Sequence, residues 1–319
     1  PLGFARVFWD CINPGTASQF VNGWHLGCLS EHYVEMFRPG SDLQNLGVFI
    51  PIRCGKSLFT NVVMPAWRWL AAPETRGIFA CFSSALGNRD SILNRDIVKS
   101  PRYQSLTSQC VLKDDQNTIR RFTNLRQGMR LTINVLQGLG EGGDILAVDD
   151  TISTENARHA ARLEKVIYWW NTTFRHRTGA NPANTKRIVS QQRLHDGDLP
   201  GHLMANEFDE WQFLVMPMEY EPKRYWWPIP GEKVDLTKLP QDWIIPTTLQ
   251  QRRPDLVDGK TGSGRERPGD LLWPEQFPAK EVAVRKRTLG RAAAAQLQQR
   301  PTSEMGSVFD MASIRRYRP

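Results

Sequence analysis

The strongest local constraint on the fold is a short apolar run, Leu46–Ile50, that leads into Gly55-Lys56-Ser57 and then into a helical stretch reaching about Leu70. A strand, a glycine-containing loop and a helix in this order are typical of a phosphate-binding loop, where backbone N–H groups at the helix N-terminus surround the anion. In such a loop the lysine reaches the outer phosphates and the hydroxyl binds Mg²⁺. Lys56 and Ser57 are therefore candidate nucleotide and metal ligands.

A second apolar run, Ile145–Val148, ends in Asp149-Asp150. A buried strand that ends in carboxylates presents them at the carboxyl edge of the sheet, where open α/β sheets bind ligands. We expect Asp149 to hold Mg²⁺ and Asp150 to orient and deprotonate the attacking water. Alone, such a run favours a strand that ends in a solvated turn. Its pairing with the loop at Lys56 favours the catalytic interpretation instead.

Short apolar runs alternate with helical stretches over the first two thirds of the chain, which predicts an α/β fold with a mainly parallel sheet covered on both faces. In the sequence, the strand predicted at Gly77–Phe82 lies between the loop that contains Lys56 and the strand that ends in Asp149-Asp150. This order is typical of the P-loop branch with an extra strand and a catalytic carboxylate. The other predicted elements are helices at 85–99, 155–174 and 199–206, a hairpin of 118–122 with 129–135, and strands at 186–191 and 211–216.

The composition of the sequence changes after Tyr220. Pro, Trp, Gly and charged residues become frequent there, and the periodic spacing of apolar residues is lost. We expect an ATPase core at 1–220 and a smaller subdomain at 221–319. Arg252–Asp270 has the composition of a loop, and Pro278–Gln299 is predicted as the last ordered element. No internal repeat is visible.

Composition narrows the class of protein. The 41 basic and 33 acidic residues give a net charge of +8, which is compatible with a polyanionic partner such as DNA. No run approaches the ~20 apolar residues of a membrane span, and nothing at the beginning indicates secretion, so a cytoplasmic protein is expected. The five cysteines are scattered without a C-x-x-C pair, which argues against disulfides and zinc. Cys54, at a helix N-terminus, is expected to have a lowered thiol pKa.

Two further segments leave alternatives open. The turn Gly138–Asp144 either approaches the nucleotide or is only a tight loop. The strand at 186–191 is followed by Gln192, and a polar residue at such a strand end can sense the γ-phosphate. His195 is expected to be structural, because no second histidine nearby could complete a metal site.

Taken together, these motifs resemble those of tailed-phage terminase large subunits. FIPIRCGKS is similar to the family's P-P-R-x-G-K-S loop, and GEGGDILAVDD to its G-x-G-x-D-h-h-h-h-D-D block. QRLHDGDLPGHL resembles the coupling segment, and LLWPEQFPAKEV with the following AAAAQLQQRPTSEMGSVF resembles the lid and linker. The resemblance runs from about Trp24 to Phe309, and the order of the motifs makes it specific.

The resemblance implies an ASCE-type ATPase core with a lid, which uses ATP and Mg²⁺ to move double-stranded DNA into a procapsid. It adds Trp24 and His25 near the adenine, and Arg53, Cys54 and Gly55 around the phosphates, with Arg53 accompanying the lysine. The implied partners are DNA, a portal protein, a small terminase subunit and sister subunits in a ring on the capsid. The isolated chain is expected to be monomeric, in the host cytoplasm.

The chain departs from the family at three places. Ile52 replaces a usual proline, Thr151-Ile152 stands where Pro-His is frequent, and Glu141 occupies a turn where many members carry arginine. The arginine that completes a neighbour's site is therefore unidentified, with Arg126, Arg130, Arg158 and Arg162 as candidates. A nuclease domain would begin near Pro319, so no nuclease activity is expected of this sequence.

Two other classes of protein fit part of the pattern. A superfamily 1/2 helicase, or another DNA-translocating P-loop ATPase, would need a second RecA-like domain, for which 221–319 looks short and irregular. A DNA-binding or assembly module with an inactive loop is suggested by Ile50, which stands where the first glycine of the full loop pattern belongs. The joint presence of Lys56, Ser57, Asp149 and Asp150 argues against such decay.

Overall fold

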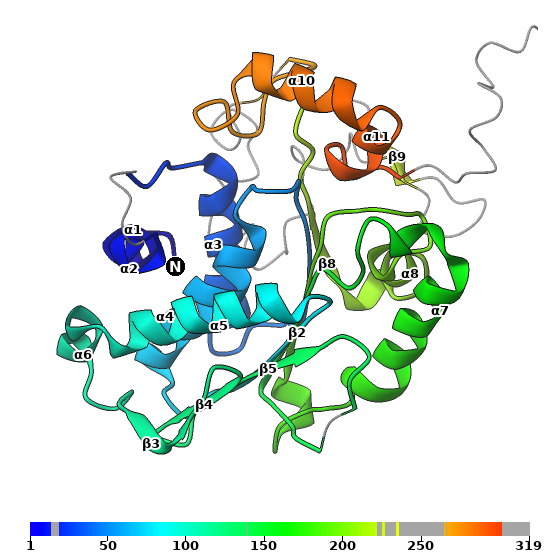
Figure 1. Cartoon of the computed structure of the whole chain (residues 1–319). Coiled ribbons are helices and arrows are strands. Elements are labelled where there is room, and N and C mark those ends of the chain that lie inside the picture. The colour runs from blue at the N-terminus through cyan, green and yellow to red at the C-terminus, as the bar shows by residue number, and fades with distance from the viewer. Residues whose placement is uncertain are drawn as a thin grey trace, which may run out of the picture.

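A central sheet with helices on both faces organises the molecule (Figure 1). The computed structural model describes residues 1–13, 19–138, 140–221, 225–226, 234–235, 265 and 267–301. The α/β class expected from the sequence is confirmed. Most of the loop predicted at Arg252–Asp270, and the sequence after Pro301, lie outside the described residues.

Eight strands form the sheet, in the spatial order β3-β4-β5-β2-β6-β7-β1-β8. Their bounds are β1 (Asn45–Phe49), β2 (Arg76–Cys81), β3 (Leu112–Asn117), β4 (Arg121–Asn124), β5 (Met129–Asn134), β6 (Ile145–Asp149), β7 (Lys186–Ser190) and β8 (Gln212–Val215). A separate two-stranded pairing joins β9 (Tyr225–Trp226) to β10 (Val234–Asp235).

The run from β5 to β8 is parallel, and the edge beyond β5 is antiparallel. In register, Ile78 of β2 faces Leu146 of β6, and Val148 of β6 faces Val189 of β7. β7 lies between β6 and β1, so the two strands that lead into the candidate motifs are separated by one strand. Their carboxyl ends nevertheless meet at one edge of the sheet.

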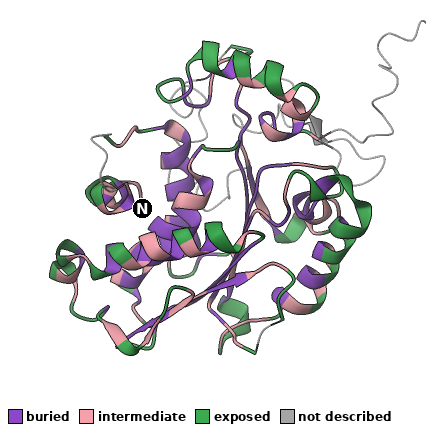
Figure 2. Ribbon diagram, in the orientation of Figure 1, coloured by how far each residue is buried: buried purple, intermediate pink, exposed green. Residues whose placement is uncertain are grey.

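Alternate side chains of the central strands enter two different cores. Ala147 of β6 packs with Leu46 and Val48 of β1 in one core, whereas Leu146 and Val148 of β6 pack in the other. All five residues of β6 are buried, because helices cover both faces (Figure 2). Strands that are buried on both faces consist of continuous apolar residues, and this is why the central strands could be predicted from the sequence.

The helices divide between the two faces of the sheet. In Figure 1 the helices from α3 to α5 lie on one side, and α7 and α8 on the other. The α-helices are α1 (Leu2–Val7), α2 (Trp9–Ile12), α3 (Trp24–Met36), α4 (Met64–Ala71), α5 (Ser84–Lys99), α6 (Pro101–Leu106), α7 (Ala160–Trp169), α8 (Leu199–Asn206), α10 (Ala279–Leu289) and α11 (Ala292–Gln296). Short 3-10 turns are η2 (Asn156–Arg158), η4 (Pro182–Asn184) and η5 (Phe208–Glu210).

Two stretches are π-helical, namely η1 (Leu58–Val63), which leads into α4, and η3 (Trp170–Phe174), which follows α7. π-Helical turns are rare in proteins, and those that occur often lie at functional sites. η1 directly follows the loop that contains Lys56. Its backbone is held from the side by α5, where the Asn94 side chain donates to the carbonyl of Val62 at 2.7 Å.

The last described elements pack on the same core as α3. Trp273 and Phe277 are buried there, and backbone hydrogen bonds join Met218 to Leu297 and Leu272 to Met218. The domain boundary near residue 220 stays a prediction. None of the helices in the described ranges is both long and apolar enough to cross a bilayer.

Several predicted elements were incomplete. The helix expected at 155–174 is split into η2, α7 and η3, and the element expected at Pro278–Gln299 breaks at Gly290, whose φ of 55° ends α10. Strand β3 was missed because its sequence, LKDDQN, is polar. Charged residues of this kind protect an edge strand from pairing with other chains. The helices before residue 37 were not predicted either.

Candidate functional site

The loop at 50–57 connects β1 to η1 and turns sharply through two residues with positive φ. Arg53 has a φ of 62° and Gly55 a φ of 83°. A Cβ on Gly55 would meet the Leu26 side chain at 2.8 Å, so only glycine fits against α3 here. The helical backbone begins at Lys56, which places its N–H groups at the end of the loop. This is the strand–loop–helix arrangement expected from the sequence.

Lys56 reaches across the sheet edge to both carboxylates that follow β6. Its Nζ lies 3.0 Å from Asp150 Oδ2 and 3.9 Å from Asp149 Oδ1. The same nitrogen is 3.4 Å from the Ser57 hydroxyl oxygen. Burial lowers the pKa of Lys56, but the charges of Asp150 and Asp149 outweigh it and raise the pKa above its usual value. The structure therefore brings together four of the residues singled out in the sequence, with the lysine charged.

Asp149 and Asp150 have different surroundings. Asp149 is buried, and its Oδ2 accepts a hydrogen bond of 3.1 Å from Asn61, whereas its Oδ1 has no hydrogen-bond partner among the described residues. Burial raises the pKa of Asp149 to about 7, although the charge of Lys56 lowers it. Asp150 is more exposed and lies in a turn with a φ of 46°.

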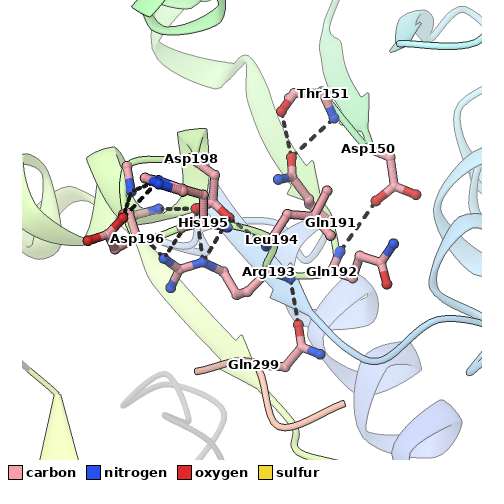
Figure 3. A network of polar contacts seen from close by, with 12 residues as sticks. Asp150, Thr151, Gln191, Gln192, Arg193, Leu194, His195, Asp196, Asp198 and Gln299 are labelled. Atoms are coloured by element: carbon pink, nitrogen blue, oxygen red, sulfur yellow. Dashed lines mark hydrogen bonds and ion pairs between the residues drawn. The ribbon is translucent and has the colours of Figure 1, made fainter. Parts of the chain in front are cut away.

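The segment after β7 lies beside Asp150 (Figure 3). The backbone N–H of Gln192 donates to Asp150 Oδ1 at 3.3 Å, and the Gln191 side chain accepts from the N–H and hydroxyl of Thr151 at 3.1 and 2.7 Å. The Oε1 atom of Gln192 is buried without a hydrogen-bond partner in the described part of the chain. The polar strand end expected at Gln192 is thus next to the candidate base.

The same segment is anchored on its other side. The Arg193 guanidinium forms a buried ion pair with Asp198, the N-cap residue of α8, at 2.9 Å. The next backbone amide after Gln192, that of Arg193, donates to Gln299 Oε1 at 2.9 Å. The N–H of Gly197 donates to His195 Nδ1 at 3.0 Å, and Asp196 lies beside the same ring nitrogen, so His195 contacts the turn that leads into α8.

Trp24 and His25 begin α3 beside the loop. His25 Nε2 is 3.0 Å from the carbonyl oxygen of Cys54, which requires this nitrogen to carry the proton. Burial lowers the pKa of His25 to about 3, so the ring is neutral. The His25 ring also packs edge-on against Trp273 at 4.9 Å, and Arg265 lies 6.0 Å from the Trp24 ring. The two residues thus join the loop to the C-terminal elements.

Two expectations for individual side chains were wrong. Cys54 is fully buried, and burial raises its thiol pKa to about 12 instead of lowering it. Arg130 cannot reach a neighbouring subunit, because its side chain is buried and its guanidinium stacks 4.2 Å from the Phe79 ring centroid. Arg53 is exposed on the loop, and no hydrogen bond of its side chain occurs within the described residues.

The described residues of the turn predicted at Gly138–Asp144 lie at the opposite end of β6 from Asp149. The Asp144 carboxylate accepts from the backbone N–H of Arg76 at 2.9 Å, and a Cβ on Gly142 would meet the carbonyl oxygen of Thr178 at 2.2 Å. Glu141 pairs with Arg76 and Arg121 at 2.9 and 2.7 Å. Glu141 therefore belongs to a surface ion-pair cluster away from Lys56.

The residues at this edge fit a magnesium ion bound through few protein ligands. No group of three or more His, Cys, Asp or Glu side chains with metal-binding geometry occurs in the described ranges. Mg²⁺ bound with a nucleotide needs only one or two protein oxygens, since phosphates and waters complete its shell. The buried, unbonded Oδ1 of Asp149 and the Ser57 hydroxyl, both close to Lys56 Nζ, are oxygen donors of the right kind.

Sequence reasoning missed Asn61 and Asp90. Asn61 lies four residues after Ser57 in a mainly apolar segment, LFTNVV, and its buried amide contacts both Asp149 and Asp90. A polar residue on the buried face of the helix after the loop was the available signal.

Comparison with solved structures gives a structural similarity to a phage protein. The crystal structure of the HK97 bacteriophage large terminase matches with 12% sequence identity and a TM-score of 0.48, over 92% of this chain and 53% of that one. The chain spans about half the length of that terminase. No family model matches, and no curated protein matches. What the chain does has to follow from its own residues.

Proposed function

We propose that the chain is a P-loop ATPase of the ASCE type. The observation that carries the proposal is the position of Lys56 Nζ, 3.0 Å from Asp150 and 3.9 Å from Asp149 at the carboxyl edge of the parallel strands. A buried lysine on a strand–loop–helix, facing two carboxylates from another strand, is the arrangement that ATP and Mg²⁺ require. The separation of β1 from β6 by β7 also fits this branch.

The proposed roles follow from the contacts. Lys56 would exchange its carboxylate partners for the β- and γ-phosphates, with the backbone N–H groups of Gly55 to Ser57 around them. Ser57 and Asp149 would hold Mg²⁺, which neutralises charge on the phosphates. Asp150 would accept the proton of the attacking water. The backbone N–H of Gln192 fixes Asp150 for this task, at 3.3 Å from Oδ1.

A role for Trp24, His25, Arg53 and Cys54 in nucleotide binding is part of the proposal. His25 would act by holding the Cys54 carbonyl and thereby the loop backbone, at 3.0 Å. Arg53 is exposed on the loop, where it is free to approach a phosphate. Cys54 would contribute its backbone alone, because its side chain is buried.

We further propose that ATP hydrolysis drives double-stranded DNA into a viral procapsid. Support comes from the ordered set of terminase-like motifs between Trp24 and Phe309 and from the net charge of +8. The partners would then be DNA, a portal protein, a small terminase subunit and sister subunits in a ring. Such a protein would work in the host cytoplasm while docked on the procapsid.

ATP turnover by the chain and by Asp150→Asn tests this proposal. The unchanged chain should hydrolyse ATP with Mg²⁺, whereas Asp150→Asn should bind ATP normally and lose about 10²–10⁴-fold in turnover, the usual contribution of a general base. Asp196→Asn is the matched control, because Asp196 is an exposed carboxylate beside the same segment. Normal hydrolysis by Asp150→Asn would place the base elsewhere.

Adding DNA to the same assay separates the motor from the bare ATPase. Duplex DNA should stimulate turnover regardless of its sequence, and the stimulation should fall steeply with salt, because Lys/Arg–phosphate contacts release counterions. Hydrolysis without any response to DNA would contradict the motor and leave the ATPase intact.

A further inference from the structure

A single amide links the candidate metal ligand to a second buried carboxylate. Asn61 Nδ2 donates to Asp149 Oδ2 and to Asp90 Oδ2, each at 3.1 Å. The three side chains come from η1, β6 and α5, and all are buried. Both amide hydrogens are used on carboxylates, so the orientation of the amide group is fixed by the contacts.

This arrangement is costly for stability alone. Buried carboxylates lose hydration, and two of them close together repel each other. Lys56 lies 3.9 Å from Asp149. Arg89 forms an ion pair of 2.7 Å with Asp90, and the buried charge of Arg130 also interacts with Asp90. Apolar side chains would fill the same space at lower cost, which points to a task for the pair.

The backbone around Asn61 is fixed from two sides. The hydroxyl of Thr60 donates to the carbonyl of Lys56 at 2.8 Å and contacts the Tyr33 hydroxyl of α3 at 2.7 Å. On the other side, Asn94 of α5 holds the carbonyl of Val62. The π-helical turn is therefore clamped between α3 and α5, with Asn61 directed to Asp149.

The contact with Asn61 leaves one oxygen of Asp149 available. Asn61 occupies Oδ2, and Oδ1 stays without a hydrogen-bond partner among the described residues, 3.9 Å from Lys56 Nζ. The Ser57 hydroxyl lies 3.4 Å from the same nitrogen. A carboxylate held by one oxygen presents the other in a defined direction, which is what a metal ligand needs.

We propose that Asn61 is a positioning residue that holds Asp149 for the metal of the bound nucleotide, and that Asp90 orients Asn61. The inference rests on the proposed ATPase function and deepens it. It makes η1 and α5 part of the metal site without any contact between Asn61 and the metal. Loss of such an outer contact typically weakens metal binding about 10–100-fold.

The test measures binding of Mn²⁺ with ADP by electron paramagnetic resonance, and binding of ADP alone in EDTA. Asn61→Leu keeps the size of the side chain and removes both hydrogen bonds. It should weaken Mn²⁺ binding about 10–100-fold and leave metal-free ADP binding unchanged. Asp90→Asn should weaken Mn²⁺ binding less, because the amide contact with Asp149 remains.

Asn124→Leu is the matched control, since Asn124 is also a buried asparagine with a hydrogen-bonded side chain but lies at the end of β4 and does not contact Asp149. It should lower the melting temperature without weakening Mn²⁺ binding. If Asn61→Leu and Asp90→Asn both bind Mn²⁺ with ADP like the unchanged chain, the inference fails while the ATPase proposal stands. If the unchanged chain binds neither ADP nor the metal, the proposed function fails and the inference with it.

Discussion

At the residue scale, the site is built around charges that compensate each other before any ligand arrives. Lys56 is buried against Asp149 and Asp150, so the ammonium stays charged in a place where burial alone would favour the neutral amine. In the proposed function, a triphosphate with Mg²⁺ would replace this arrangement, because the phosphates would bind the lysine and the metal would bind the carboxylate. The pre-formed pair thus keeps the loop ready for an anion.

His25 gives the chain a specific pH dependence. Its pKa is lowered by burial to about 3 in the folded state, from 6.5 in the unfolded chain. Between these values the unfolded chain binds a proton that the folded state excludes, so the stability present above pH 6.5 is lost as the pH falls towards 3, by up to ~1.4 kcal/mol per pH unit. Urea unfolding at pH 7 and pH 5 measures this loss. His25→Gln should show a smaller loss, and parallel losses in the two proteins would contradict the assignment.

Residue types and their order were sufficient to find Lys56, Ser57, Asp149 and Asp150, because strand ends of a parallel sheet converge. They were not sufficient for side-chain environments. Cys54 has the local sequence of a reactive thiol, yet it is fully buried in a core that includes α3, and α3 was not predicted. The polar character of Asn61 was a signal in the sequence, but its partners Asp149 and Asp90 could be identified only once α5 and β6 were placed around it.

At the element scale, apolar runs in the sequence identified the buried strands. The edge strand β3 was missed because its residues are polar. The turn between β4 and β5 shows how an edge element is held. The side chain of Asn124 accepts from the N–H of Gly128 at 2.9 Å and donates to the carbonyl of Pro73 at 2.7 Å. The hairpin is thereby fixed to the connection that leads into β2.

Gly128→Ala should destabilise the protein. A Cβ at this position would lie 1.9 Å from the carbonyl oxygen of Pro73, so the backbone has to move. Overpacking of this kind costs about 1–3 kcal/mol, which urea unfolding can measure. Gly138→Ala is the control, since a Cβ there has nothing within 4 Å. Equal stability of the two variants would show that the turn is not packed as described.

At the scale of the whole molecule, the order of the strands places the loop with Lys56 and the carboxylates Asp149 and Asp150 at one edge of the sheet. The arginine that would stabilise the transition state of ATP hydrolysis is not assigned. Arg126, Arg158 and Arg162 are exposed, whereas Arg130 is buried. An arginine supplied by a neighbour is worth about 10³–10⁵ in rate. The proposed function implies that a neighbouring subunit of a ring would supply this arginine.

ATP turnover per molecule should therefore rise with protein concentration. Replacing the arginine that acts should leave ATP affinity unchanged and abolish the rise, and Arg158→Ala and Arg162→Ala are the first variants to compare. Mixing that variant with Asp150→Asn should restore part of the turnover, since each chain supplies what the other lacks. Fast turnover that stays constant from dilute to concentrated solution would show that no neighbour is needed.

The most direct test of the central claim is ATP turnover by Lys56→Ala, with ATP binding measured on the same samples. Without the ammonium, a charge-assisted contact with the phosphates is lost, so we expect no detectable hydrolysis and at least about 10-fold weaker ATP binding. Lys165→Ala, at an exposed lysine of α7, should behave like the unchanged chain. Thermal melting checks that both variants are folded. Full turnover by a folded Lys56→Ala would contradict the assignment of this loop as the ATP site.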